Sequence, residues 1–270
     1  MSDSQRRQIT GFSNPTIKRL RSLREKKHRK REGHFLAEGL RILTEALDAG
    51  KTPKLLVLVE DAPLHPLAEK IEQATLDAGG EVIETSEAII AKLSGKSNPQ
   101  SIIGIYADHP TPLAELDRKL SDIWLVAQAL RDPGNLGTIL RTGDAIGAGG
   151  LILIDDCVDP FAVEAVRASM GAIFTQKITQ ASWEEFLPWL RSGEGQLVGT
   201  SLNTDKDYQA VRYSPPTFLL IGNEAQGLPA SYETACDILV KMPMMGKADS
   251  LNAAMASAVM GYEVLNQRRK

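Results

Sequence analysis

Residues 123–155, IWLVAQALRDPGNLGTILRTGDAIGAGGLILID, decide the fold of the second half of the chain. The apolar runs at 123–130 and 151–155 have the length and composition of buried strands, and residues 135–147 have the apolar spacing of a helix. A strand, a helix and a strand in this order form the unit of a parallel sheet that is covered by helices on both faces. Ligands of such sheets bind beyond the carboxyl ends of the strands, which is where the turn at 132–135 lies.

Strands and helices also alternate in the rest of the chain. Before residue 109, strands are expected at 55–60, 81–84 and 102–107, and helices at 35–49, 66–78 and 86–93. After residue 155, helices are expected at 161–170, 182–191 and 250–267, and strands at 196–200, 217–222 and 237–242. The segment HPTPLAELDRKL (109–120) has two prolines and no clear apolar face, so we expect a linker there. The predicted organisation is an α/β domain at 1–108 and a second α/β domain with a mainly parallel sheet at 121–270.

The composition is that of a soluble globular protein, since 43% of the 270 residues are hydrophobic and 24% are charged. No apolar run approaches the roughly 20 residues needed to cross a bilayer, and the start MSDSQRRQIT is polar. We therefore expect a cytoplasmic protein with no membrane partner.

Several kinds of catalytic site are disfavoured. All four histidines precede residue 110, so the second domain has no histidine base, Ser-His-Asp triad or histidine zinc site. Cys157 and Cys236 lie far apart without a CxxC, which indicates buried thiols and no metal site or disulfide framework. Neither GxGxxG nor GxxxxGK followed by Ser or Thr occurs, which argues against ordinary Rossmann and P-loop nucleotide sites.

Positive charge is concentrated near the N-terminus. Nine cations and Glu25 give residues 18–31 a net charge of +8, which leaves −11 on the rest of a chain whose total is −3. This asymmetry favours a polyanionic partner, either RNA, DNA or anionic lipid, and the alternative is a solvated helix face. The cations are Lys18, Arg19, Arg21, Arg24, Lys26, Lys27, Arg29, Lys30 and Arg31.

Two polar turns follow apolar strands. In DPGNLGTILRT (132–142), Asn135 is expected to cap the helix that carries Arg141, although a capped helix with a surface arginine has the same pattern. In IGNEAQGLP (221–229), Glu224 lies between two glycines at the sheet edge, where a carboxylate orients a sugar hydroxyl or a cation. The alternative role for Glu224 is that of an acid at a helix N-terminus.

A third segment, KMPMMGKADSLNAAM (241–255), leads from a strand through a loop into a helix. Ser250 is a natural N-cap, and the free N–H groups of that helix start suit an anion such as phosphate. Met242, Met244 and Met245 could pack a flat base such as adenine, or they could belong to the core. Because all three segments follow strands of one sheet, we expect them to meet in one ligand site.

These three segments resemble, in order and spacing, the motifs of the SpoU/TrmH family of RNA 2′-O-methyltransferases, part of the SPOUT superfamily. SNPTIKRLRSL (13–23) and GHFLAEGLRIL (33–43) resemble the family's substrate-binding domain, which has a fold like that of ribosomal protein L30e. The resemblance implies a deep trefoil knot formed by residues 220–260 and S-adenosylmethionine as cofactor. It also implies a homodimer whose active sites are completed at the interface, with the helix at 250–267 as an interface element.

The resemblance further implies roles for five polar residues. Arg141 would assist deprotonation of the 2′-hydroxyl, but a free guanidinium has a pKa above about 12, so the final proton acceptor stays open. Asn135 and Ser250 would place the target ribose and its phosphate, while Glu224 and Asn252 would hold the loops.

The cofactor contacts implied by the resemblance lie in the second and third motifs and just before them. Two positions depart from the family pattern: Ala225 stands where glycine is usual, and Met242 where isoleucine is usual. Both replacements are conservative in size and affect fine cofactor geometry at most. The implied contacts are Thr200, Leu202, Gly222, Asn223, Gly227, Met242, Met244, Gly246, Ser250, Leu251 and Ala253.

The leading hypothesis is ribose 2′-O-methylation of ribosomal RNA, with the nine cations contacting RNA. Transfer RNA is the nearest alternative substrate. A non-catalytic RNA-binding protein would be expected to lack Asn135, Arg141 or Ser250, and all three are present. A DNA-binding regulator is disfavoured because no helix-turn-helix pattern occurs.

Overall fold

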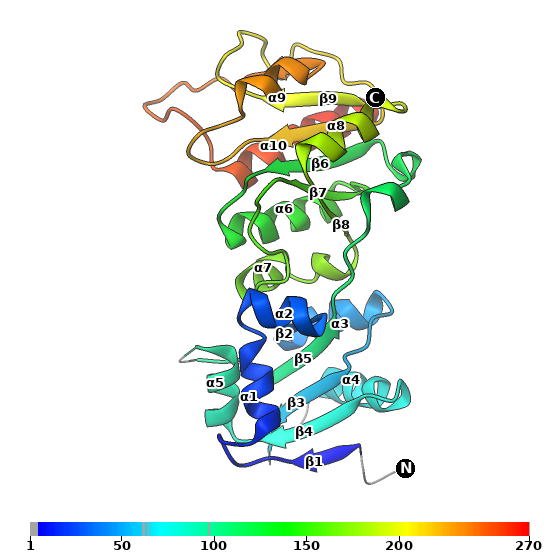
Figure 1. The fold of residues 1–270 in the computed structure, drawn as a ribbon, viewed down its shortest axis with the longest axis vertical. Coiled ribbons are helices and arrows are strands. Elements are labelled where there is room, and N and C mark those ends of the chain that lie inside the picture. The colour runs from blue at the N-terminus through cyan, green and yellow to red at the C-terminus, as the bar shows by residue number, and fades with distance from the viewer. Residues whose placement is uncertain (1–4, 61–62, 64, 97, 270) are drawn as a thin grey trace. The chain divides into compact units, whose positions relative to one another are not determined.

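The computed structural model describes residues 5–60, 63, 65–96 and 98–269, and the chain folds into two compact units (Figure 1). Unit 1 joins residues 1–108 with 161–175, and unit 2 joins 109–160 with 176–270. Residues 109–120, expected to be a linker, therefore belong to unit 2. Residues 161–175 were expected in the second domain but fold with unit 1.

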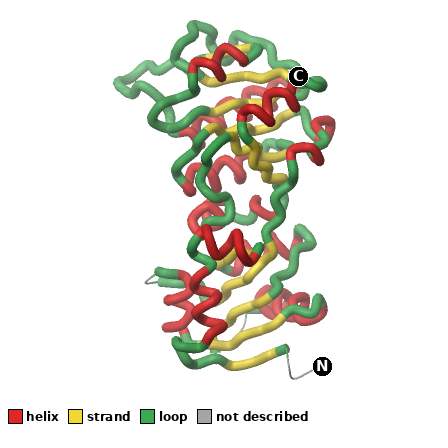
Figure 2. The backbone as a smooth tube through the Cα atoms, viewed as in Figure 1, coloured by secondary structure: helices red, strands yellow, loops and turns green. Residues whose placement is uncertain are grey.

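Unit 1 is built on a five-stranded mixed sheet (Figure 2). Its strands are β1 (Arg6–Gln8), β2 (His34–Glu38), β3 (Leu55–Val59), β4 (Glu81–Thr85) and β5 (Ile102–Ala107). Its helices are α1 (Pro15–Ser22), α2 (Lys26–Glu32), α3 (Leu40–Asp48), α4 (Pro66–Asp77), α5 (Glu87–Ser94) and α7 (Val163–Ser169), with the 3-10 turn η3 (Ala172–Phe174). The strand order is β1-β4-β3-β5-β2, and β5 runs antiparallel to both of its neighbours.

The helix predicted at 35–49 is wrong in its first part, because these residues begin with β2 and α3 follows it. Phe35 is fully buried and packs against the rings of Phe161 and Phe174. A strand buried in this way lacks the alternation that marks a half-exposed strand, so its apolar run reads equally well as a helix. Gly39, with a φ of 105°, separates the two elements.

A buried carboxylate at the end of β2 attaches α7 to unit 1. The Glu38 side chain is 2% exposed, and its Oε2 lies 2.5 Å from Nη2 of Arg167. Ser94 Oγ and the backbone N–H of Gln100 donate to Glu38 Oε1 at 2.8 and 2.9 Å. Burial raises the pKa of Glu38, but the three donors outweigh burial and leave the pKa below its ordinary value. An ion pair thus adds to the apolar contacts of the 161–175 segment.

Unit 2 is built on a six-stranded sheet whose pairings are all parallel. Its strands are β6 (Ile123–Gln128), β7 (Gly150–Ile154), β8 (Lys177–Ala181), β9 (Gln196–Thr200), β10 (Thr217–Ile221) and β11 (Ile238–Val240). Its helices are α6 (Pro133–Ala145), α8 (Trp183–Arg191), α9 (Ala230–Ala235) and α10 (Ala253–Arg268), with the 3-10 turns η1 (Leu113–Glu115) and η2 (Arg118–Leu120). The order β11-β9-β10-β6-β7-β8 confirms the predicted α/β fold with a mainly parallel sheet, although β8 and α9 were not expected. It also makes β6 and β10 neighbours, so the loops that follow them lie at one edge.

Two helix starts differ from the prediction. Asp132 caps α6, since its carboxylate accepts a hydrogen bond from the backbone N–H of Asn135 at 2.6 Å. Asn252 caps α10, where its side chain accepts from two backbone N–H groups of the first turn. Asn135 and Ser250, predicted as the caps, are therefore not used in that way.

The two cysteines are free thiols. Cys157 is buried, as predicted, whereas Cys236 is only partly buried. Burial raises the pKa of Cys157 to about 11 and that of Cys236 to about 12, so both thiols are protonated at neutral pH. Among the described residues, no helix has the length and apolar character required to span a bilayer, and no group of three or more His, Cys, Asp or Glu is arranged to hold a metal.

Candidate functional site

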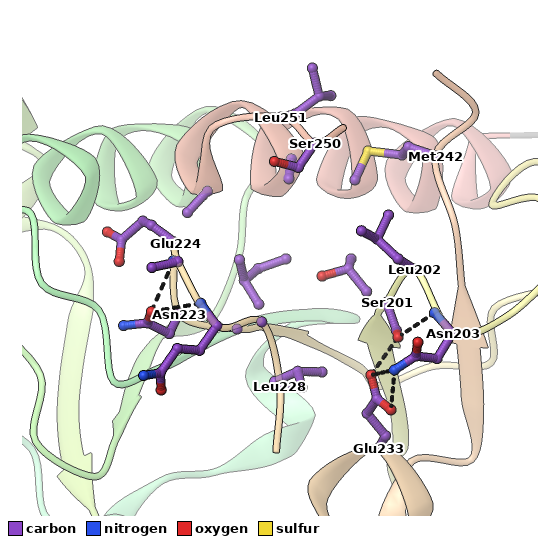
Figure 3. Close-up of a pocket in the computed structure, with 18 of the residues that line it drawn as sticks. Ser201, Leu202, Asn203, Asn223, Glu224, Leu228, Glu233, Met242, Ser250 and Leu251 are labelled. Carbon is purple, nitrogen blue, oxygen red and sulfur yellow. Dashed lines mark hydrogen bonds between the residues drawn. The ribbon is translucent and has the colours of Figure 1, made fainter. Parts of the chain in front are cut away.

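A pocket of about 360 Å³ lies beyond the carboxyl ends of β9, β10 and β11 (Figure 3). This size is typical of small-molecule sites. Its walls come from the loops that follow these strands and from the start of α10. Ten of the eleven residues expected to contact a cofactor line it: Thr200, Leu202, Gly222, Asn223, Gly227, Met242, Met244, Ser250, Leu251 and Ala253.

The eleventh residue, Gly246, is exposed and does not line the pocket. Its neighbour Met245 is 96% exposed and likewise lies outside the pocket, so the suggestion that Met245 packs a base is wrong for this structure. Met242 and Met244 do line the pocket. The loop between β11 and α10 therefore contributes its first part and its end to the site, but not its tip.

A second pocket adjoins the first, and the two share residues 223–225 and 250–251. A chain of amide hydrogen bonds runs along it. Asn252 Nδ2 donates to Asn135 Oδ1 at 2.8 Å, and Asn135 Nδ2 donates to Glu224 Oε1 at 3.1 Å. Four of the five expected functional polar residues therefore lie together here: Asn135, Glu224, Ser250 and Asn252.

Glu224 is the acceptor at the end of this chain. The backbone N–H groups of Arg131 and Asp132 also donate to its two carboxylate oxygens, at 3.3 and 3.4 Å. Burial raises the pKa of Glu224, but the hydrogen bonds from Asn135 and from the backbone lower it further than burial raises it. The ionised carboxylate thus fastens the loop after β10 to the loop after β6.

Gly222 and Asn223 shape the loop after β10. A Cβ atom at Gly222 would lie 2.5 Å from the carbonyl carbon of Gly227, so no other residue fits there without moving the backbone. Asn223 Nδ2 donates to the carbonyl of Ala129 at 2.8 Å, and Asn223 Oδ1 accepts from two N–H groups of its own turn. Ala129 itself has a φ of 48°, an uncommon conformation for a residue with a side chain. This strained position at the end of β6 is held by Asn223.

Arg141 is not part of this group within one chain. It is exposed on α6 and lines neither pocket. It follows Asn135 by six positions of the helix, which places the two about 120° apart around the helix and about 9 Å apart along it. One chain alone therefore does not bring Arg141 to the other four polar residues.

The nine cations predicted to bind RNA occupy α1, α2 and the turn between them. Eight are exposed, but Arg29 is 5% exposed, and its guanidinium donates to the carbonyls of Leu23 and Arg24 at 2.8 and 2.7 Å. Arg29 therefore holds the turn between the helices, a role that counting charges does not reveal.

The exposed cations also differ among themselves. Arg19 and Arg31 pair with Glu32 at 2.9 and 3.3 Å, which offsets part of their charge. Three others line a pocket of unit 1 together with Lys92 of α5; they are Lys18, Arg21 and Arg24. Glu25 and Glu164 also line this pocket, but its four cations outnumber these two acids, so it suits a phosphate group.

The first pocket of unit 2 fits S-adenosylmethionine, the cofactor that the resemblance implies. Leu202, Leu228 and Met242 offer apolar surface to a purine ring, and Glu224 offers negative charge to a sulfonium ion. A pocket of this kind, joined to a polar pocket at the carboxyl edge of a parallel sheet, is the arrangement of a group-transfer enzyme.

The comparisons with known proteins agree with this class. The SpoU rRNA Methylase family matches residues 122–262, and the MRM3-like substrate binding domain matches residues 14–104. An AdoMet-bound rRNA methyltransferase from Sinorhizobium meliloti is 38% identical with a TM-score of 0.90, and the match covers 97% of this chain and 98% of that one.

Two curated relatives also match most of the chain. The 23S rRNA (guanosine(2553)-2'-O)-methyltransferase RlmP of Bacillus subtilis is 29% identical over 96% of this chain and 99% of its own length. The 23S rRNA (uridine(2479)-2'-O)-methyltransferase of Streptomyces viridochromogenes is 31% identical over 89% of this chain and 85% of its own length. This chain therefore belongs to the SpoU rRNA methylase family, which uses S-adenosylmethionine, and its unit 1 contains an MRM3-like substrate-binding domain.

Four polar residues that line the first pocket were not predicted from the sequence, namely Ser201, Asn203, Gln226 and Glu233. Gln226 directly precedes the predicted contact Gly227. Ser201 and Asn203 flank the predicted contact Leu202 directly after β9, so their position was a usable signal. Glu233 lies on α9, a helix that was itself not expected, and no pattern in the sequence marked it.

Proposed function

We propose that this protein transfers a methyl group from S-adenosylmethionine to a ribose 2′-hydroxyl of ribosomal RNA in the cytoplasm. The observation that carries the proposal is the wall shared by the two pockets, residues 223–225 and 250–251. A donor in the first pocket and a ribose in the second would meet across this wall. Transfer then depends mainly on holding the two in line.

The residues of the second pocket suit that task. When bound, the cofactor supplies an electrophilic methyl group on a sulfonium ion. Asn135 and Ser250 would place the ribose and its phosphate, while Glu224 and Asn252 fix Asn135 from both sides by hydrogen bonds. The 2′-hydroxyl must lose its proton as its oxygen bonds to the methyl carbon, and Arg141 would assist that loss by hydrogen bonding.

A homodimer would bring Arg141 to the site. Leu251, just before α10, and three residues of α10 form an exposed apolar stripe at helical spacing: Met255, Val259 and Tyr262 are 63%, 36% and 53% exposed. Such a stripe is typical of an interface. We infer that two copies pair through this helix and that Arg141 of one completes the site of the other. The trefoil knot at 220–260 likewise remains a prediction from the family.

Ribosomal RNA is the preferred substrate because the two curated relatives named above both act on 23S rRNA. Their names give different nucleotides, a guanosine and a uridine, so the proposal extends to the RNA and the reaction but not to the base. Unit 1 would bind the RNA with the exposed cations of α1 and α2. Transfer RNA is the second candidate, because the same methylase fold also matches a structure concerned with 2-OH methylation of tRNA, with a TM-score of 0.51.

The test is a methylation assay on purified protein with methyl-labelled S-adenosylmethionine and unmodified rRNA or tRNA. Digestion to nucleosides should release a labelled 2′-O-methylnucleoside from rRNA, and the Arg141→Ala variant should release far less. Label in tRNA alone would shift the substrate. Label on a base, or none on either RNA or on ribosomal subunits despite cofactor binding, would refute the proposal.

A further inference from the structure

The first pocket contains a carboxylate for which the family motifs give no role. Glu233 lies at the end of the pocket away from Glu224, beside Ser201 and Asn203 (Figure 3). Ser201 Oγ donates a short hydrogen bond to Glu233 Oε1, and Asn203 Nδ2 lies within 3.3 and 3.1 Å of the two carboxylate oxygens. The backbone N–H of Asn203 in turn donates to Ser201 Oγ at 2.9 Å. The carboxylate is therefore fixed by the loop after β9.

This network leaves Glu233 with spare capacity as an acceptor. An ionised carboxylate has about four lone-pair positions. Ser201 occupies one, and the single Nδ2 group of Asn203 is shared between the two oxygens. At least one position remains for a donor in the pocket, and a pair of adjacent hydroxyl groups could use both oxygens.

The position of Glu233 indicates which part of the cofactor it meets. The reacting methyl must lie at the wall that the two pockets share, near Glu224 and Ser250. Glu233 is at the other end, where Leu202 and Met242 supply apolar surface. Apolar walls suit adenosine, whereas the amino-acid arm of the cofactor would bring its own carboxylate toward that of Glu233. Adenosine donates hydrogen bonds through its ribose hydroxyls.

We propose that Glu233, oriented by Ser201 and Asn203, is a cofactor-binding residue that accepts hydrogen bonds from the ribose hydroxyls of S-adenosylmethionine. This assignment rests on the proposed function only in taking the first pocket as the cofactor site. If the assignment is correct, the protein recognises the ribose hydroxyls and binds adenosine compounds more tightly than deoxyadenosine compounds.

Binding of two ligands to two proteins tests the assignment. The ligands are 5′-methylthioadenosine, which has the ribose but no amino-acid arm, and its 2′,3′-dideoxy counterpart, and the readout is isothermal titration calorimetry. Loss of the hydroxyls should weaken binding to the unsubstituted protein about tenfold, the scale of a hydrogen bond to a charged group. For Glu233→Gln the same loss should weaken binding less than about threefold.

The ligand comparison separates recognition from a purely structural role. If Glu233 only stabilised the loop, both proteins would show the same ratio of affinities, and the assignment would fail. It would also fail if the unsubstituted protein did not bind 5′-methylthioadenosine. Glu194→Gln, at an exposed site outside the pocket, is the matched control and should keep the full ratio.

A second variant covers the case in which Glu233→Gln does not fold. Ser201→Ala keeps the carboxylate but removes the hydroxyl that orients it, so an intermediate ratio of affinities is expected, and an unchanged ratio counts against the assignment. Failure of the proposed function looks different. In that case the ligands bind with the expected ratios, but no RNA receives a methyl group.

Discussion

The ion pair between Glu38 and Arg167 leads to a quantitative prediction about unit 1. Glu38→Gln removes the charge but keeps the shape of the side chain. It leaves Arg167 with an uncompensated charge, and it places an amide where Ser94 and Gln100 now donate to a carboxylate. Breaking a buried pair in this way costs about 3–5 kcal/mol. Because the Arg167 side chain is 29% exposed, water offsets part of the loss, and we expect about 3 kcal/mol.

The same pair predicts a dependence on pH. Folding lowers the pKa of Glu38 from its ordinary value of 4.5, so the native state favours the ionised form. The stabilisation is therefore fully present above pH 4.5 and is lost as the pH falls through the lower, native pKa. The difference in unfolding free energy between the native sequence and Glu38→Gln should be constant near neutrality and shrink in acid.

Urea unfolding, followed by circular dichroism at several pH values, measures both effects. The matched control is Glu81→Gln, which breaks the exposed pair between Arg7 and Glu81 on the same sheet; its side chains are 47% and 51% exposed, and the expected loss is below about 1 kcal/mol. A loss for Glu38→Gln no larger than the control, or one that does not shrink in acid, would refute the reasoning.

Three further predictions concern the two candidate sites. Asn135→Ala breaks both hydrogen bonds of the amide chain and should lower kcat about 30-fold, the effect of about 2 kcal/mol. Because Asn135 does not line the first pocket, cofactor affinity should change little, and a comparable loss of affinity in calorimetry would contradict the assigned role of Asn135. Gly222→Ala forces the backbone near Gly227 to move and should weaken cofactor binding at least tenfold, and unchanged affinity would show that the loop adapts freely. Replacing Arg21 and Arg24 with glutamine should reduce the slope of log K against log salt for RNA binding by about 1.5, measured by filter binding. Arg29→Gln should mainly lower the melting temperature, because Arg29 holds the turn between α1 and α2. If the Arg21 and Arg24 variant keeps the slope of the unsubstituted protein, the RNA binds elsewhere.

The sequence predicted the second domain better than the first, for physical reasons. The strands of unit 2 are apolar runs set between helices, and three irregular loops follow them, so their meeting at one edge followed from the rules of parallel sheets. In unit 1, β2 is buried and lacks the alternation of a half-exposed strand. Its apolar residues therefore appeared to continue the helical spacing of the residues that follow, and the predicted helix began too early. Short elements such as β1 carry too few residues for any periodic signal.

For both helices whose N-cap was predicted incorrectly, another residue that is able to cap lies close by. Asp132 and Asn252 cap the two helices because they lie at the residue where each helix begins, and that residue is set by the loop and not by the capping preference of Asn135 or Ser250. Arg29 was counted with the surface cations, since burial of one arginine among nine depends on tertiary contacts.

The passage of residues 161–175 into unit 1 has a consequence for how the molecule can be divided. The chain crosses from one unit to the other after residues 108, 160 and 175, so no single cut separates them. A fragment beginning at residue 109 would keep the whole catalytic sheet, yet it would carry Phe161, Phe174 and Arg167 without the ring of Phe35 and the carboxylate of Glu38 that they contact. The residues that match the methylase family, 122–262, are therefore continuous in the sequence, whereas unit 2, which contains most of them, is interrupted by residues 161–175.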